Sequence, residues 1–199
     1  MATEPEFENG FQALVLAAGT ASRFGGRKLL ADWNGAPLLH AALAAARAAP
    51  VHGITVVTGA DAVDVSACVE AFDPAIRRVH AANYAQGMAE SLKAGVAALP
   101  AQTAAVFVFL GDMPRVPQGL LQALADAVQT GAPAAAPVFQ GRRGNPVVLA
   151  RSVFGDIAGL EGDTGARQIL QALGSQVALV ESPDDGILFD IDRPADLGG

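Results

Sequence analysis

Residues 11–19 read FQALVLAAG and are followed by a polar loop that extends to Lys28. The apolar run is continuous rather than alternating, which is typical of a parallel strand that is buried on both faces. Its length suits a strand better than a helix, and the glycine after it marks the end of the element. The start of the chain therefore indicates an α/β unit, in which a buried strand leads through a glycine-bearing loop to a helix.

The same alternation of strand and helix continues along the chain. Further strands are predicted at residues 53–58, 77–81, 104–110 and 176–181. Helices are predicted at residues 37–49, 61–72, 87–99, 118–129 and 163–173. Two apolar pieces interrupt the alternation as a hairpin, at residues 134–139 and 145–149. We expect a flexible leader at residues 1–10 and then one domain over residues 11–199, with a mostly parallel sheet covered by helices on both faces.

The composition excludes several classes of protein. The 199 residues include 13 basic and 20 acidic side chains, and the net charge of −7 argues against a nucleic-acid polymer as partner. The single cysteine, Cys68, excludes an internal disulfide and any zinc site built on several cysteines. The longest apolar runs are too short to span a bilayer, and the first residues are acidic where a signal peptide is basic. We therefore expect a cytoplasmic protein that does not bind a membrane.

Topology predicts where a ligand binds. In an open parallel sheet, the ligand lies beyond the carboxyl ends of the strands. The loops that follow Ala18, Thr58, Ala81 and Leu110 should therefore meet at one edge of the sheet. Functional side chains are expected in those loops.

The loop after the first strand has the composition of a phosphate-binding loop. Three glycines permit conformations in which successive backbone N–H groups point at one anion, and Arg23, Arg27 and Lys28 supply positive charge. Leu29 stands where a Walker A loop needs serine or threonine, and the Gly-x-Gly-x-x-Gly pattern of dinucleotide-binding loops is absent. The remaining alternative is a flexible glycine loop with solvated cations.

Six spaced motifs, taken in order, resemble the signature of the nucleotidyltransferases related to the molybdenum cofactor enzymes, and of the cytidylyltransferase branch in particular. The first motif is LAAGxxxRFGGxKLL at residues 16–30. The others are GMxxSLxxG at 87–95, GDMP at 111–114, RGNP at 143–146, GDxGAR at 162–167 and DIDxPxDL at 190–197.

The resemblance implies a Rossmann-like, three-layer αβα nucleotidyltransferase fold. It implies transfer of CMP from CTP onto the terminal phosphate of a molybdopterin-type cofactor, which releases pyrophosphate and forms molybdopterin cytosine dinucleotide. Mg²⁺ is the implied metal, and a molybdoenzyme or its chaperone is the implied recipient of the product. A guanylyltransferase and a sugar-phosphate pyrophosphorylase of the same fold remain alternatives, because a fold does not fix a function. A glycosyltransferase is a more distant alternative, because Asp190-x-Asp192 superficially resembles the metal-binding motif of those enzymes.

The resemblance implies which charged residues bind the triphosphate and the metal. Arg23 and Lys28 hold the triphosphate, and Asp112 completes the catalytic set. Asp112 follows a predicted strand, where a carboxylate faces the ligand edge and suits Mg²⁺, although an Asp that caps a turn would look the same. Asp192 is the second implied metal ligand, with Asp190 as the alternative.

The implied nucleotide-binding residues come from strand ends and from the start of one helix. Ala18 favours CTP, because guanylyl enzymes of the family more often have glycine there. Two alternatives stay open: Met88 is apolar and is equally explained by packing against its neighbours, and Ser91 is equally explained as an ordinary polar residue of a helix. The full set is Leu16, Ala17, Ala18, Gly19, Arg23, Lys28, Asn83, Gly87, Met88, Ser91 and Gly111.

The late motifs imply the residues that bind the pterin substrate, which are Gly144, Asn145, Pro146, Asp163 and Arg167. Histidine is frequent in the family at the position of Asn145, so the chain departs from the pattern there, although an amide can still donate a hydrogen bond. Asp163 is equally well explained as the N-cap of the helix that follows it.

Overall fold

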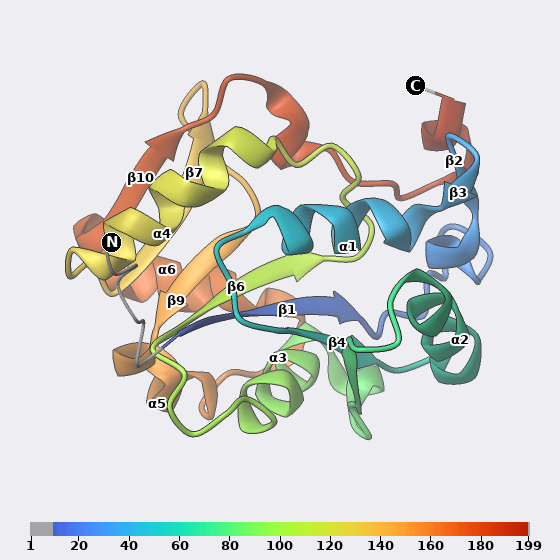
Figure 1. Ribbon diagram of the computed structural model, residues 1–199, viewed down its shortest axis with the longest axis horizontal. Helices are drawn as coiled ribbons and strands as arrows, with labels where there is room; N and C mark the ends of the chain where they lie inside the picture. The colour runs from blue at the N-terminus through green and yellow to red at the C-terminus, as the bar shows by residue number, and fades with distance from the viewer. Residues whose placement is uncertain (1–9, 199) are drawn as a thin grey trace, which may run out of the picture.

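A mixed, mostly parallel sheet lies at the centre of the fold (Figure 1). The computed structural model describes residues 10–198, so residues 1–9 of the predicted leader lie outside the described part. The strand order is β10-β7-β9-β6-β1-β4-β5, with β8 paired to β7. These strands are β1 (Phe11–Ala17), β4 (Ile54–Thr58), β5 (Arg77–His80), β6 (Ala105–Leu110), β7 (Ala134–Phe139), β8 (Arg142–Arg143), β9 (Val147–Ala150) and β10 (Val177–Glu181). Strands β8 and β9 run in the direction opposite to that of the other strands in this sheet.

Helices cover both faces of the sheet and complete three layers. One face carries α1 (Leu38–Ala48), α2 (Ala62–Phe72) and α4 (Leu121–Gln129). The other carries α3 (Met88–Ala97), α5 (Phe154–Ile157) and α6 (Ala166–Leu173). Figure 1 shows α1 and α4 above the sheet and α3 and α5 below it. The expected αβα arrangement with a mostly parallel sheet is confirmed.

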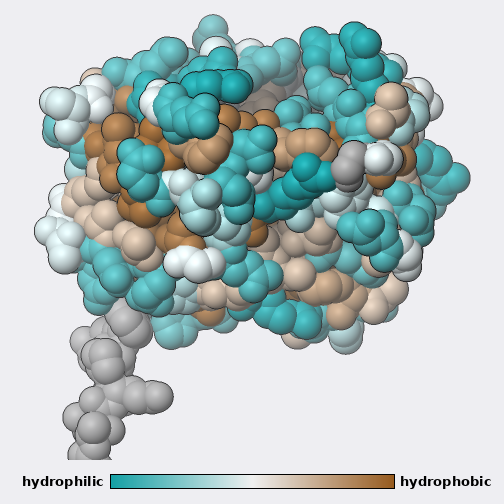
Figure 2. Space-filling model, turned by 90° about the horizontal axis from the view of Figure 1, so that it is seen from above, coloured by the Kyte–Doolittle hydropathy of each residue, from teal (hydrophilic) through white to brown (hydrophobic). Residues whose placement is uncertain are grey.

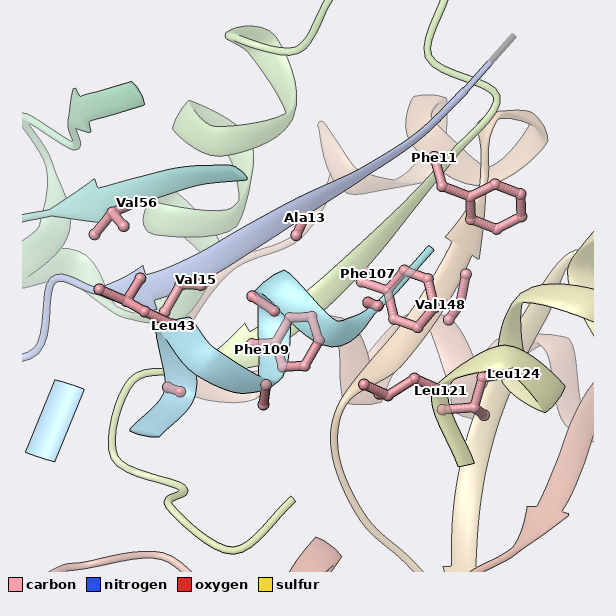
Figure 3. Packing of buried hydrophobic residues seen from close by; sticks show 14 of the residues in the cluster. Phe11, Ala13, Val15, Leu43, Val56, Phe107, Phe109, Leu121, Leu124 and Val148 are labelled. Carbon is pink, nitrogen blue, oxygen red and sulfur yellow. The ribbon is translucent and has the colours of Figure 1, made fainter. Parts of the chain in front are cut away.

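Strand β1 explains why its sequence is apolar without interruption. Val15 packs on the side of α1, α2 and α4, its neighbour Leu14 packs on the opposite side, and both side chains are 0% exposed. Successive side chains of a strand point to opposite faces, so a strand covered on both faces needs apolar residues throughout. The adjacent strand β6 presents Phe107 and Phe109 to the same side as Val15, between α1 and α4 (Figure 3).

The predicted hairpin is present and is larger than a simple two-stranded turn. Gln140 and Gly141 have φ angles of 49° and 75°, and beyond them β8 pairs with the end of β7. The chain then returns as β9, which pairs with the start of β7 and also with β6. Strand β9 therefore joins the parallel part of the sheet to β7 and β10.

A second small hairpin was not predicted from the sequence. Strands β2 (Asp32–Trp33) and β3 (Ala36–Pro37) are joined by Asn34 and Gly35, which have φ angles of 55° and 87°. Asn-Gly is the preferred pair for a two-residue hairpin turn, because both residues tolerate positive φ. The signal for this hairpin was thus present in the sequence.

The helix predicted to begin at residue 163 begins later. Gly162–Thr164 forms a 3-10 turn, Gly165 has a φ of 49°, and α6 starts only at Ala166. The prediction that the helix starts at Asp163 was therefore wrong, because the positive φ at Gly165 separates the turn from the helix.

The surface mixes hydrophilic and hydrophobic residues, as the view from above shows (Figure 2). Large hydrophobic residues that stay exposed within residues 10–198 come from three separate elements and are Val63, Met88 and Leu179. No helix in this part of the chain is long and apolar enough to cross a membrane.

Candidate active site

A pocket of about 350 Å³ opens at the carboxyl ends of the parallel strands. Its walls come from the loops after β1, β4, β5 and β6, which confirms that these loops meet at one edge of the sheet. The lining residues are Leu16, Ala17, Ala18, Gly19, Thr20, Ala21, Lys28, Leu29, Asp61, Val65, Tyr84, Ala85, Gly87, Met88, Ser91, Leu110, Asp112 and Asp163. This position matches the ligand site expected for open α/β sheets.

The loop after β1 folds back on one of its own carbonyl oxygens. The backbone N–H groups of Phe24, Gly25 and Gly26 all donate to the carbonyl oxygen of Ala21, at 3.0, 3.1 and 3.1 Å. Both glycines have φ angles near 95°, which glycine adopts without strain. These three amides are thus paired within the loop, and their residues do not line the pocket, so they do not form the open anion-binding nest that the sequence predicts.

Lys28 and Asp112 are in direct contact at the pocket wall. The Lys28 Nζ atom lies 2.6 Å from Asp112 Oδ2, and the two side chains are only 12% and 23% exposed. Lys28 begins a 3-10 turn that ends at Leu30, and Asp112 lies just beyond β6. Two segments far apart in sequence therefore bring opposite charges together at the end of the sheet.

Asp192 extends this pair into a network of four charges. Its Oδ2 atom accepts a hydrogen bond from Arg23 NH1 at 3.1 Å, and its Oδ1 atom lies 3.8 Å from Lys28 Nζ. The C-terminal segment is held in place because the N–H group of Ile191 donates to the carbonyl oxygen of Asp112, at 3.0 Å. The predicted triphosphate ligands and the predicted metal ligands are thus side by side.

The carboxylates of this region influence one another. Partial desolvation raises the pKa of Asp190, and the negative charges of Asp112 and Asp192 raise it further. Asp196 behaves in the opposite way, because hydrogen bonds from the backbone N–H groups of Arg193 and Asp192 lower its pKa. Negative charge is therefore concentrated where a cation would be held, although no group of three or more His, Cys, Asp and Glu side chains within residues 10–198 is arranged as a metal cluster.

Arg27 takes no part in this network. Its NH2 atom pairs with Asp64 Oδ2 of α2, at 2.6 Å, and both side chains are largely exposed. Arg27 itself has a φ of 51° and precedes the 3-10 turn of Lys28. Its contact fastens the loop to α2 and leaves Arg23 and Lys28 as the cations beside the carboxylates.

The start of α3 forms the opposite wall of the pocket. The N–H group of Met88, the first residue of α3, donates to Asp163 Oδ1 at 3.3 Å. Gly87 has a φ of 122°, and a side chain there would overlap the backbone of Gly162. Asp163 therefore binds the N-terminus of α3 and is not the N-cap of α6, which is Gly165.

Other predicted residues lie near the pocket but not on its wall. Gly111, next to Asp112, donates its N–H group to the carbonyl oxygen of Leu16. Asn83 is exposed and precedes the 3-10 turn Tyr84–Gln86. Gly111 and Asn83 flank lining residues without lining the pocket themselves, and Arg23 and Asp192 are not among the lining residues either.

The predicted pterin-binding residues are divided between two places. Asp163 lines the pocket, whereas Gly144, Asn145, Pro146 and Arg167 do not. The N–H group of Asn145 donates to the carbonyl oxygen of Ile187, and a side chain at Gly144 would overlap the same residue. Arg167 is exposed on α6.

Sequence reasoning missed several lining residues. Asp61 and Tyr84 line the pocket from the loops after β4 and β5. Their position after predicted strands was the available signal, because the topological rule places every such loop at this edge. Neither residue belongs to a motif. The sequence therefore did not indicate which residue of each loop lines the pocket.

Comparisons with known proteins bear on the fold and the family of the chain. A molybdenum cofactor cytidylyltransferase from Escherichia coli K12 is 28% identical over 189 residues, which cover 95% of this chain and 94% of that protein. The crystal structure of Rv0371c from Mycobacterium tuberculosis has a TM-score of 0.81 at 25% identity and covers 95% of this chain and 96% of its own. A complex of Rv0371c with manganese has a TM-score of 0.75 at 25% identity and covers 87% of this chain and 89% of its own.

A family model assigns the chain to a class of enzyme. The model of the MobA-like NTP transferase domain matches residues 13–177, a range that begins in β1 and ends at the start of β10. That range contains the loop of Lys28, the strand end at Asp112 and the start of α3. The chain is therefore a nucleotidyltransferase and belongs to the family of MobA-like NTP transferase domains.

Proposed function

We propose that the chain transfers CMP from CTP onto the terminal phosphate of a molybdopterin-type cofactor, with release of pyrophosphate. The main support is the contact of Lys28 with Asp112 at the wall of the pocket, because a cation for the triphosphate and a carboxylate for a metal meet there. The name of the Escherichia coli relative supports the choice of substrates. The product is molybdopterin cytosine dinucleotide, to be passed to a molybdoenzyme or its chaperone.

The reaction requires positioning and charge neutralisation rather than covalent catalysis. An oxygen of the acceptor phosphate attacks the α-phosphorus of CTP, and the bond from that phosphorus to the bridging oxygen breaks. Pyrophosphate leaves with the electron pair of that bond. The attacking oxygen is already anionic, so the step needs no general base. Arg23 and Lys28 bind the triphosphate and neutralise the charge that develops on the leaving group.

The donor atoms fit a divalent cation. Oxygen atoms of Asp112 and Asp192 lie 2.6 and 3.8 Å from the same Lys28 ammonium group, so both carboxylates can approach one positive charge. Carboxylate oxygens are preferred ligands of hard cations, and we propose Mg²⁺ as the metal. When bound, the metal would neutralise phosphate charge and orient the triphosphate.

The base and the acceptor are proposed to enter from different sides of the pocket. Ala18 follows β1, Tyr84 lies in the 3-10 turn after β5, and Ser91 lies in α3. These three residues are proposed to bind cytosine and ribose together with Gly87 and Met88. Ala18 and Ser91 are buried, so a base there would be in close contact with the protein. The acceptor is proposed to reach the α-phosphate past Asp163, with Arg167 and the Gly144 loop farther out.

Pyrophosphate release tests the proposal. Each of the four ribonucleoside triphosphates is incubated with the enzyme and Mg²⁺, with and without molybdopterin. Release that requires both CTP and molybdopterin is expected, and the dinucleotide is identified by mass spectrometry.

Asp112→Asn should reduce turnover by about 10²-fold or more. Asp156→Asn changes the same charge at an exposed position of α5 and serves as the matched control. Release with GTP alone among the nucleotides, or only with a sugar phosphate, would show that a related transferase activity is the correct one.

A further inference from the structure

We propose that Lys28 is an internal counter-ion that competes with the metal for Asp112. The inference rests on the proposed roles of these residues in binding triphosphate and metal, and it adds a link between the two binding events. In this view, a triphosphate draws Lys28 away from Asp112, and the carboxylate then becomes available to the metal. Metal binding and triphosphate binding are therefore coupled through one side chain.

The contact between Lys28 and Asp112 is strong enough to compete. The two charged atoms are 2.6 Å apart, and both side chains are mostly buried, at 12% and 23% exposure. Partly buried charges attract more strongly than solvated ones, because less water screens them. A divalent cation at Asp112 must displace this ammonium group or repel it at close range.

The backbone keeps Lys28 near Asp112. Lys28 belongs to the 3-10 turn Lys28–Leu30, and both Leu29 and Leu30 pack against the hydrophobic core. The preceding residue, Arg27, is fastened to Asp64 of α2 at 2.6 Å. The backbone of Lys28 is therefore fixed by contacts on both sides. This keeps the ammonium group close to the Asp112 carboxylate.

Arg23 repeats the arrangement more weakly on the second carboxylate. Its NH1 atom is 3.1 Å from Asp192 Oδ2, but the side chains are 75% and 47% exposed. Exposed ion pairs contribute little because solvent and salt screen them. Release of Asp192 from Arg23 should therefore matter less for metal binding than release of Asp112 from Lys28.

A triphosphate offers both cations a better partner. It carries several negative charges on oxygen atoms that accept charge-assisted hydrogen bonds. Each cation that turns to the triphosphate leaves a carboxylate free, and Mg²⁺ typically binds a few carboxylates together with substrate phosphates. Because linkage is reciprocal, the triphosphate tightens metal binding by the same factor as the metal tightens triphosphate binding.

The test measures Mn²⁺ binding to the whole chain without nucleotide or pterin. Free Mn²⁺ is followed by electron paramagnetic resonance at constant pH and ionic strength. Lys28→Met should bind Mn²⁺ about tenfold more tightly than the wild type, within the usual range of coupling between sites. Arg23→Met should give a smaller gain. The double variant Lys28→Met/Asp112→Asn should lose the gain, because the carboxylate that Lys28 releases is gone.

Arg27→Met is the matched control. It removes one positive charge from the same loop, but the partner of Arg27 is Asp64 rather than a pocket carboxylate. Equal Mn²⁺ affinities for Lys28→Met and Arg27→Met would overturn the inference, as would a gain that survives Asp112→Asn. Circular dichroism checks that each variant is folded. If Lys28→Met does not fold, Lys28→Gln takes its place, and an affinity no higher than that of Arg27→Met overturns the inference.

The outcome is independent of the substrate assignment. Neither CTP nor molybdopterin is present in these titrations, so failure of cytidylyl transfer leaves the Mn²⁺ result intact. Conversely, unchanged Mn²⁺ affinity in Lys28→Met, with normal cytidylyl transfer by the wild type, rejects the competition and keeps the proposed reaction.

Discussion

Ala18 lies where the end of β1 meets the pocket. Its side chain is buried, and its carbonyl oxygen accepts a hydrogen bond from the N–H group of Ala60. Gly59 packs so closely that a side chain there would overlap both Ala18 and Tyr84. The methyl group of Ala18 thus occupies a confined position at the pocket wall, where one carbon atom changes the available space.

Ala18→Gly should shift base selectivity toward the larger purine. Removal of one methyl group from a close contact changes discrimination by about tenfold or more. We expect the ratio of kcat/KM for GTP to that for CTP to rise by about this factor, measured by pyrophosphate release. An unchanged ratio in a folded variant would mean that Ala18 does not face the base.

Cys68 should react slowly while the protein is folded. The thiol is buried in α2, and this burial raises its pKa above the ordinary value of 9.0. Because the thiolate is the nucleophile, alkylation by iodoacetamide at about pH 8 should be at least ~10-fold slower than in denaturant. The raised pKa favours the folded state below the pKa of the unfolded thiol, and this contribution is lost as the pH rises through the folded value. Equal rates in buffer and in denaturant would show that the thiol is accessible.

The C-terminal segment carries Asp192, the second carboxylate of the site. Arg115 lies over the ring of Phe189, with 4.0 Å between the guanidinium carbon and the ring centroid, and over Trp33 of β2 at 5.6 Å. This stack joins the hairpin β2–β3, the loop after β6 and the C-terminal segment. Asp192 is therefore positioned by contacts among three elements that are distant in sequence.

The turn after Asp192 should contribute a pH-dependent part of the stability. Asp196 accepts hydrogen bonds from the N–H groups of Asp192 and Arg193 at 2.9 and 2.7 Å, which lower its pKa from the ordinary value of 3.8. A lowered pKa stabilises the folded state above the unfolded pKa, and this effect is lost as the pH falls through the folded value. The Tm of Asp196→Asn should therefore be lower than that of the wild type at about pH 7, and the difference should shrink as the pH falls below about 4. A difference that is independent of pH would contradict this role.

The sequence predicts some strands and loops of this fold better than it predicts the contacts between them. Strand β1 and strand β6 were predictable because a strand covered on both faces needs a continuous apolar run, and the edge where their loops meet follows from topology. The contact of Asp163 with Met88 was not predictable, because it joins positions 75 residues apart. The ion pairs of Lys28 and Asp192 also depend on tertiary packing, so the motifs indicated the residue types but not their partners.

One aromatic cluster packs on the face of the sheet that α1 and α4 cover. The ring of Phe107 lies 6.0 Å from that of Phe11 and 5.9 Å from that of Phe109, measured between centroids. Phe107 is 0% exposed. Strand β6, which carries it, also pairs with both β1 and β9, so packing here connects the two parts of the sheet.

Phe107→Ala should destabilise the entire fold. Truncation of a buried phenylalanine costs about 3–5 kcal/mol in the free energy of unfolding, because apolar contacts are lost and a cavity remains. Urea denaturation should show this loss as a lower midpoint. Exposed Val63→Ala, on α2, is the control and should change the free energy of unfolding by less than about 0.5 kcal/mol. A small effect of Phe107→Ala would mean that the core closes around the vacant space.

Strand β9 also has a consequence for synthesis of the chain on the ribosome. Strands β5, β4, β1 and β6 can pair once residue 110 has emerged, but the other side of β6 is covered only by β9, at residues 147–150. A nascent chain of intermediate length therefore presents an apolar edge strand, and such edges template association with other chains. When β9 pairs antiparallel with β6, it completes the sheet and also covers the exposed edge of β6.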